Sequence, residues 1–87
     1  MNIKNMTSAN GNKIANQFEV RDDQGNIFFQ SYDSIIVKIG KGKTFLDEKF
    51  WNYSNTTSKY RNQFLGETTK ETAAKIKSGE YTLTNLN

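Results

Sequence analysis

The hydrophobic pattern of this chain changes from the period of a strand to that of a helix close to residue 50, and this change constrains the fold more than any other feature. Before it, apolar residues alternate with polar ones, as on a half-buried strand. Clusters rich in Gly, Asp, Asn and Ser separate the alternating runs, which favours tight turns. The runs are residues 14–20, 27–30, 35–39 and 44–46. The first half therefore predicts an antiparallel β-meander of about four strands.

After the change, the spacing is typical of short helices. Ser54 is a suitable N-cap, and Tyr60 and Phe64 follow four residues apart. Gly66 stands where a C′ residue in the left-handed conformation belongs. These signals predict a first helix that ends just before Gly66.

A second helix is predicted directly after the first. Thr68 and Glu71 have the spacing of a capping box, with Thr at the N-cap and Glu at the third helical position. We expect Ala73 and Ile76 to face inward, and Glu71 to pair with Lys75 one turn later.

Gly79 marks the end of this helix, and the alternating residues 80–84 indicate a last strand. The predicted fold class is α+β, with an antiparallel meander of about four strands, two short helices and a C-terminal strand.

The chain has 87 residues, which suffices for one small domain. Residues 1–12 are polar and predict a flexible N-terminal arm or an edge strand, while residues 13–87 form the single α+β domain. The apolar residues make up 34% of the chain, so the core must be small. Phe28 and Phe29 are neighbours and cannot both be buried on one face of a sheet. One of them is therefore available to a partner or covered by another element.

Several functional classes are excluded by residue content. No apolar stretch approaches the length that spans a bilayer. The chain has no His and no Cys, which removes the commonest nucleophiles, bases and metal ligands. The first residues lack the apolar region of a secretory signal, so we expect a cytoplasmic protein. We expect no cofactor, no metal and no enzymatic activity.

Two motifs resemble parts of functional sites, but the residues around them argue against that interpretation. Residues 40–44 read Gly-Lys-Gly-Lys-Thr, which resembles the end of a phosphate-binding P-loop. Val37 stands where that loop needs its first glycine, and a strand rather than a helix follows, so we interpret the segment as a hairpin turn. The acidic pairs 22–23 and 47–48 are interpreted as solvated loop charges.

Aromatic residues and exposed lysines are the strongest candidates for partner binding. Aromatic side chains are enriched at the energetic centres of protein interfaces. Lysines at a hairpin tip or on a helix can meet an acidic surface or a phosphate backbone. The candidate partner-binding residues are Phe28, Tyr32, Lys41, Lys43, Phe50, Tyr53 and Lys70.

Two strings in the chain are distinctive: FQSYDSII at residues 29–36, and WNYSNTTSKY at residues 51–60 with Phe64 and Leu65 after it. They resemble the pattern of a family of small proteins of unknown function that phages, plasmids and other mobile elements of low-GC bacteria encode. The resemblance covers roughly residues 17–81. Asn52 stands where the family pattern has an acidic residue. The resemblance implies a mobile-element context and carries no activity with it.

Small phage proteins without enzymatic activity often bind and block a host protein, and anti-CRISPR and other anti-defence proteins are the best-known kind. We therefore expect a non-enzymatic inhibitor whose partner is a host protein or nucleoprotein complex. The alternative is a small nucleic-acid-binding accessory or regulatory protein that uses Lys41, Lys43 and the second helix. The net charge of +3 fits only weak nucleic-acid binding. The sequence does not decide whether the chain forms a homodimer, and no membrane partner is expected.

Overall fold

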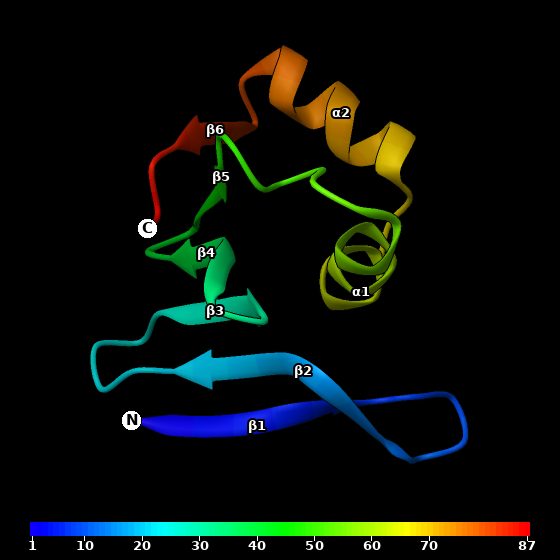
Figure 1. Cartoon of the computed structure of the whole chain (residues 1–87). Helices are drawn as coiled ribbons and strands as arrows, with labels where there is room; N and C mark the ends of the chain where they lie inside the picture. Colours follow the sequence, from blue (N-terminus) through cyan, green and yellow to red (C-terminus); the bar gives the residue numbers. More distant parts are fainter.

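Six strands, which follow one another across the sheet in chain order, and two helices form the fold (Figure 1). The computed structural model describes all residues from Met1 to Asn87. The strands are β1 (Asn2–Thr7), β2 (Lys13–Arg21), β3 (Ile27–Ser31), β4 (Ser34–Gly40), β5 (Lys43–Asp47) and β6 (Tyr81–Thr84). The helices are α1 (Asn55–Leu65) and α2 (Thr69–Ser78). The predicted α+β class is confirmed.

The predicted number of strands is wrong, because the N-terminal segment also joins the sheet. β1 pairs antiparallel with β2, with Asn2 opposite Arg21, and forms an edge of the sheet. The meander therefore has five antiparallel strands rather than four. Five of the six side chains of β1 are not buried, so its sequence lacks the alternation that reveals a half-buried strand.

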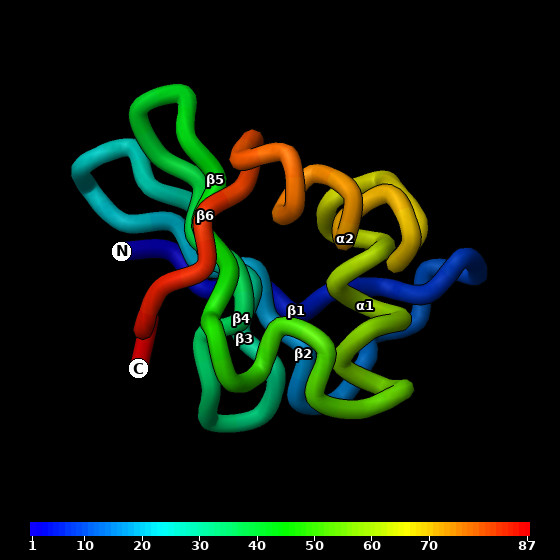
Figure 2. The backbone as a smooth tube through the Cα atoms, turned by 90° about the horizontal axis from the view of Figure 1, so that it is seen from above, coloured from blue at the N-terminus to red at the C-terminus, as the bar shows by residue number.

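The C-terminal strand lies at the opposite edge and runs parallel to its neighbour. Thr44 of β5 pairs with Tyr81 of β6, and the register continues to Asp47 and Thr84. Parallel neighbours need a crossover connection, which the two helices supply here. Both helices lie on the same face of the sheet (Figure 2). Neither helix has the length and apolar character needed to cross a bilayer.

The predicted helix ends are confirmed. The hydroxyl of Ser54 accepts a hydrogen bond from the N–H of Thr57 at 3.1 Å, which caps α1. Gly66 follows α1 with a φ of 70°, in the left-handed region that glycine tolerates best. Thr68 and Glu71 form the reciprocal capping box of α2, and Gly79 follows that helix.

The predicted inward face of α2 is partly wrong. Thr72 is buried, Ile76 packs against the core as expected, and Ala73 is exposed. The predicted pairing of Glu71 with Lys75 is also wrong. Glu71 is engaged by the N–H of Thr68 in the capping box, whereas Lys75 pairs with Glu67 at 2.8 Å.

The core lies between the sheet and the helices. Its buried apolar members are Met6, Phe29, Ile36, Val37, Leu46 and Tyr81. The ring of Phe29 stacks on Phe64 of α1, with ring centroids 5.7 Å apart. Phe28 therefore points to the helix-free face of the sheet, because neighbouring side chains alternate along a strand.

A buried arginine joins the two helices. Arg61 of α1 is fully buried and donates hydrogen bonds to the carbonyl of Trp51 and to the hydroxyl of Thr69 in α2. Its guanidinium lies 5.2 Å from the centroid of the Trp51 ring. Burial lowers the pKa of Arg61 below its ordinary value, yet the group remains a cation at any physiological pH. The helix pair is thus held by a polar contact.

Candidate partner-binding surface

Three of the predicted partner-binding residues line one groove on the surface. Tyr32, Phe50 and Tyr53 surround a depression of about 350 Å³, which we call the tyrosine groove. Tyr32 belongs to the two-residue turn between β3 and β4, whereas Phe50 and Tyr53 belong to the loop between β5 and α1. The remaining lining residues are Ser31, Asp33, Ser34, Ile36 and Thr57. Aromatic side chains thus share this groove with polar ones.

Tyr32 is exposed and has an unfavourable backbone conformation. Its side chain is 55% exposed and its φ is 55°, in the left-handed region. A bulky residue in this region is unusual, and the conformation persists only where its surroundings enforce it. Two hydrogen bonds do so here. The N–H of Tyr32 donates to the carbonyl of Asn16, and its own carbonyl accepts from the Gln30 side chain, both at 2.7 Å.

Phe50 and Tyr53 form the other wall of the tyrosine groove. Their rings meet edge to face, with centroids 5.4 Å apart and an interplanar angle of 82°. Tyr53 is 69% exposed, the largest exposure of any aromatic side chain in the structure. Phe50 is half-buried and packs against the core, so one ring anchors the loop while the other faces solvent.

Asp47 fixes the loop that carries these two rings. Its side chain is 1% exposed, so the prediction of a solvated carboxylate is wrong. The carboxylate accepts hydrogen bonds from the N–H groups of Lys49 and Phe50 at 3.0 Å and of Leu86 at 2.8 Å, and from the Asn87 side chain at 3.0 Å. Burial alone would raise the pKa of Asp47, but these hydrogen bonds outweigh it and lower the pKa.

The floor of the groove is polar and firmly connected. The hydroxyls of Ser31 and Thr57 share a hydrogen bond at 3.1 Å, which links the end of β3 to the first turn of α1. Thr57 also accepts from the hydroxyl of Ser54 at 3.2 Å. The walls of the groove are therefore attached to a rigid base.

The other four predicted residues lie elsewhere. Lys41 and Lys43 line a separate pocket at the opposite end of β4. Phe28 is half-buried on the helix-free face of the sheet, and Lys70 is exposed in the first turn of α2. Lys70 lines none of the pockets. The structure thus separates the predicted set into an aromatic groove, a lysine pocket and two isolated residues.

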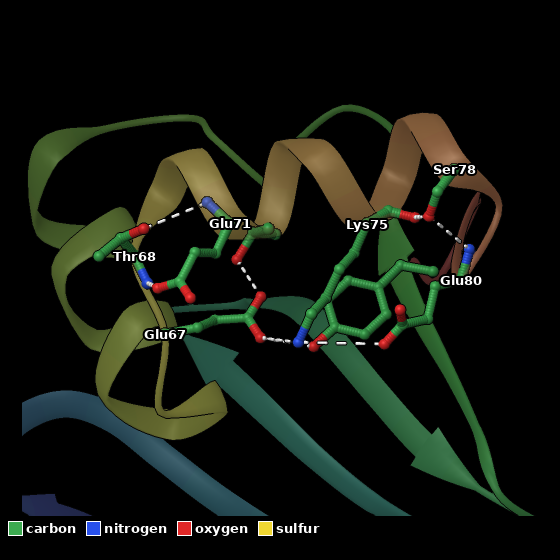
Figure 3. Close-up of polar contacts among 8 residues, drawn as sticks. Glu67, Thr68, Glu71, Lys75, Ser78 and Glu80 are labelled. Atoms are coloured by element: carbon green, nitrogen blue, oxygen red, sulfur yellow. Dashed lines mark hydrogen bonds and ion pairs between the residues drawn. The ribbon is translucent and has the colours of Figure 1, made fainter.

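Glu67 is the centre of a polar cluster that sequence reasoning missed (Figure 3). Its carboxylate accepts hydrogen bonds from Lys75 and the Tyr81 hydroxyl, both at 2.8 Å, and from the Thr72 hydroxyl. The Glu67 side chain is only 5% exposed. Burial opposes its charge, but the three hydrogen bonds outweigh burial and lower its pKa. The hydrogen bond to Glu67, together with the neighbouring Tyr81, raises the pKa of Lys75.

This cluster has the properties of a structural contact. Both carboxylate oxygens of Glu67 accept hydrogen bonds from protein donors, and these three contacts hold the side chain inside the fold. The contacts join the turn between the helices to α2 and β6. No sequence signal marks Glu67, because its partners are recruited by the tertiary fold. The functional surface is therefore better sought in the tyrosine groove.

The fold and this groove define a small α+β protein with a preorganised aromatic surface. The chain belongs to a family of unknown function, DUF8033, whose model matches residues 1–81. No curated protein and no solved structure matches the chain.

Proposed function

We propose that this chain is a non-enzymatic binding protein that engages a partner protein through the tyrosine groove. The observation that carries the proposal is the exposed Tyr32, held in a left-handed conformation by two hydrogen bonds beside the exposed Tyr53. Backbone strain of this kind is concentrated at functional sites. A strained backbone that carries an exposed ring favours a role for the Tyr32 ring in binding rather than in folding.

A protein is the partner that this chemistry suits best. Tyrosine offers a large apolar ring and a hydroxyl, and it loses little side-chain freedom on binding. The hydrogen bonds at Tyr32 and Asp47 fix both walls of the groove before any partner arrives. Such preorganisation lowers the free-energy cost of association.

We further propose that binding inhibits a host protein in the bacterial cytoplasm, as anti-defence proteins of mobile elements do. The resemblance of residues 29–36 and 51–60 to mobile-element proteins supports this part of the proposal. The carboxylates of Asp47 and Glu67 accept hydrogen bonds within the fold, which fits a structural role for both residues.

The test is a quantitative pull-down from a low-GC bacterial lysate with three forms of the protein. The wild type is compared with Tyr32→Ala/Tyr53→Ala and with Ile3→Ala, which removes an apolar side chain that is 62% exposed on β1. A partner should be lost with the tyrosine variant and retained with the Ile3 variant. The dissociation constant for the purified partner should be at least about 30-fold higher for the tyrosine variant than for the wild type. Equal capture by all three forms would refute the proposed groove.

A further inference from the structure

Three lysines that form no close ion pair surround one pocket at the end of the sheet. Lys38, Lys41 and Lys43 line an open pocket of about 630 Å³ together with Gln24, Asn26, Gly40 and Phe45. The ion pairs of the structure involve only the amino terminus, Arg21 and Lys75 as cations. Lys38 lies near enough to Asp22 to help lower the pKa of that carboxyl, whereas Lys41 and Lys43 are free to meet an anionic ligand.

The turn that carries two of these lysines is strained. Lys41 and Gly42 both have a positive φ, 54° and 74°, as a type I′ hairpin turn requires. Asn or Gly is the preferred first residue of such a turn, whereas a long side chain there is costly. Lys41 is exposed at this position. The outlier indicates that a charge at the tip of the hairpin has a use outside the fold.

Aromatic side chains flank the third lysine. In the sheet register, Lys38 lies between Phe28 of β3 and Phe45 of β5. Their sequence neighbours Phe29, Val37 and Leu46 are in the core beneath the helices, so these three side chains share the helix-free face. Phe28 and Phe45 are half-buried rather than buried. Figure 2 shows this face turned away from both helices.

The turn between β2 and β3 completes the pocket with amide groups. Gln24 is exposed, and a Cβ on Gly40 would lie 2.0 Å from Oδ1 of Asn26, so glycine leaves room for this side chain. Asp22 lies close by, but its carboxylate already accepts from the N–H of Gln24, the N–H of Asn26 and the Asn26 side chain, each at 2.9 Å. The surroundings of the pocket therefore carry a net positive charge, because three lysines face a single carboxylate that is already hydrogen-bonded.

We propose that this face binds single-stranded nucleic acid. The lysines would contact phosphates, unpaired bases would stack on Phe45 and Phe28, and the amides of Gln24 and Asn26 would meet base edges. Lysine charges alternating with aromatic rings fit a single strand better than an acidic protein surface, because every nucleotide of the strand carries both a phosphate and a base that can stack. The pocket has no arginine to read a duplex groove. The proposal is independent of the tyrosine groove, which lies at the other end of β4.

Fluorescence anisotropy with a labelled oligo(dT) of roughly 16 nucleotides tests the charge component. Binding is measured over a salt series for the wild type, for Lys41→Gln/Lys43→Gln, and for Lys13→Gln/Lys59→Gln as a charge-matched control at exposed positions outside the pocket. The first double variant should bind about tenfold more weakly, and its log–log salt slope should be shallower by about 1.4, at ~0.7 per lost phosphate contact. The control should change affinity less than about twofold. Equal loss in both double variants, or no binding of oligo(dT) by the wild type at about 50 mM salt, would overturn the proposal.

A second measurement tests the aromatic component. Phe45→Leu keeps an apolar side chain but removes the ring, so it should weaken oligo(dT) binding about fivefold while the salt slope stays unchanged. Circular dichroism melting confirms that this variant is folded. Polyglutamate and a duplex of the same length serve as competing ligands. If either binds as tightly as oligo(dT) and Phe45→Leu has no effect, the face recognises an acidic chain or a duplex instead, and the proposal fails.

Discussion

The N–H of Tyr32 donates to the carbonyl of Asn16 at 2.7 Å, and both residues have a positive φ, 55° and 64°. The contact joins the β3–β4 turn to an irregular position in the middle of β2. A left-handed Asn, which tolerates this conformation, thus supports a left-handed Tyr, which does not, and the position of the exposed Tyr32 ring depends on this contact. A substitution at Tyr32 can therefore change the stability of the fold and the affinity for a partner in opposite directions.

Replacing Tyr32 by Asn should raise the free energy of unfolding by up to about 1 kcal/mol, because Asn tolerates the left-handed region better than Tyr. The same change should weaken partner binding. Urea denaturation measures the first effect, and titration with the partner measures the second. A variant that is less stable than the wild type would show instead that the ring supports the fold.

Replacing Arg61 by Ala should lower the free energy of unfolding by about 3 kcal/mol, because it opens a cavity and leaves the carbonyl of Trp51 without its donor. Arg21→Ala is the matched control. Arg21 is 58% exposed and pairs with Glu19 at 3.1 Å, so its loss should cost less than about 1 kcal/mol. Urea denaturation followed by Trp51 fluorescence measures both. Equal effects would contradict the buried role of Arg61.

Acid should destabilise the protein through Glu67 and Asp47. Both pKa values are lower in the folded state than in the unfolded chain, so their contribution to stability is complete above the unfolded values, near pH 4. It is lost as the pH falls through the folded values. Glu67→Gln should lower stability at pH 7 by about 2 kcal/mol and flatten the decline below about pH 4.

Urea denaturation at a series of pH values from neutral to acid checks this prediction. Glu48→Gln, at an exposed position beside Asp47, is the control and should leave both the stability at neutral pH and the acid decline unchanged. An acid decline that is identical in the wild type and in Glu67→Gln would exclude Glu67 as its source.

Replacing Gly40 by Ala should lower stability by about 1 kcal/mol, because the new Cβ displaces Asn26 and breaks its hydrogen bond to Asp22. Asn26→Gly removes the side chain that clashes with that Cβ. In the double variant, the Gly40 substitution should therefore cost less than it does alone. Thermal denaturation of the four forms gives the coupling energy. Additive effects would show that the two residues do not compete for space.

Local patterns predicted most of the fold. The helix ends follow from capping residues such as Ser54 and Thr68, whose effect depends on a few neighbouring residues. For residues 1–12 the sequence left an arm and an edge strand as alternatives, because an edge strand with exposed side chains, such as β1, needs no alternation. The parallel pairing of β6 with β5 depends on how the two helices pack on the sheet, and local sequence patterns do not encode that packing.

The candidate site was predicted only as a set of residue types. Exposed aromatics in loops favour an interface, and Tyr32 and Tyr53 were selected for that reason. Their meeting in one groove depends on hydrogen bonds between distant residues, such as that of Asp47 with Leu86. Buried polar groups such as Arg61 and Glu67 were missed for the same reason, because their partners come from the tertiary structure.

The position of β6 affects how the chain folds as it is synthesised. Tyr81 completes both the core and the Glu67 cluster, yet it belongs to the strand of this sheet that is synthesised last. Until β6 pairs with β5, that edge of β5 is unpaired, and Glu67 lacks the hydrogen bond from the Tyr81 hydroxyl. The nascent chain therefore passes through a stage with an open strand edge, where pairing with another chain is the competing reaction.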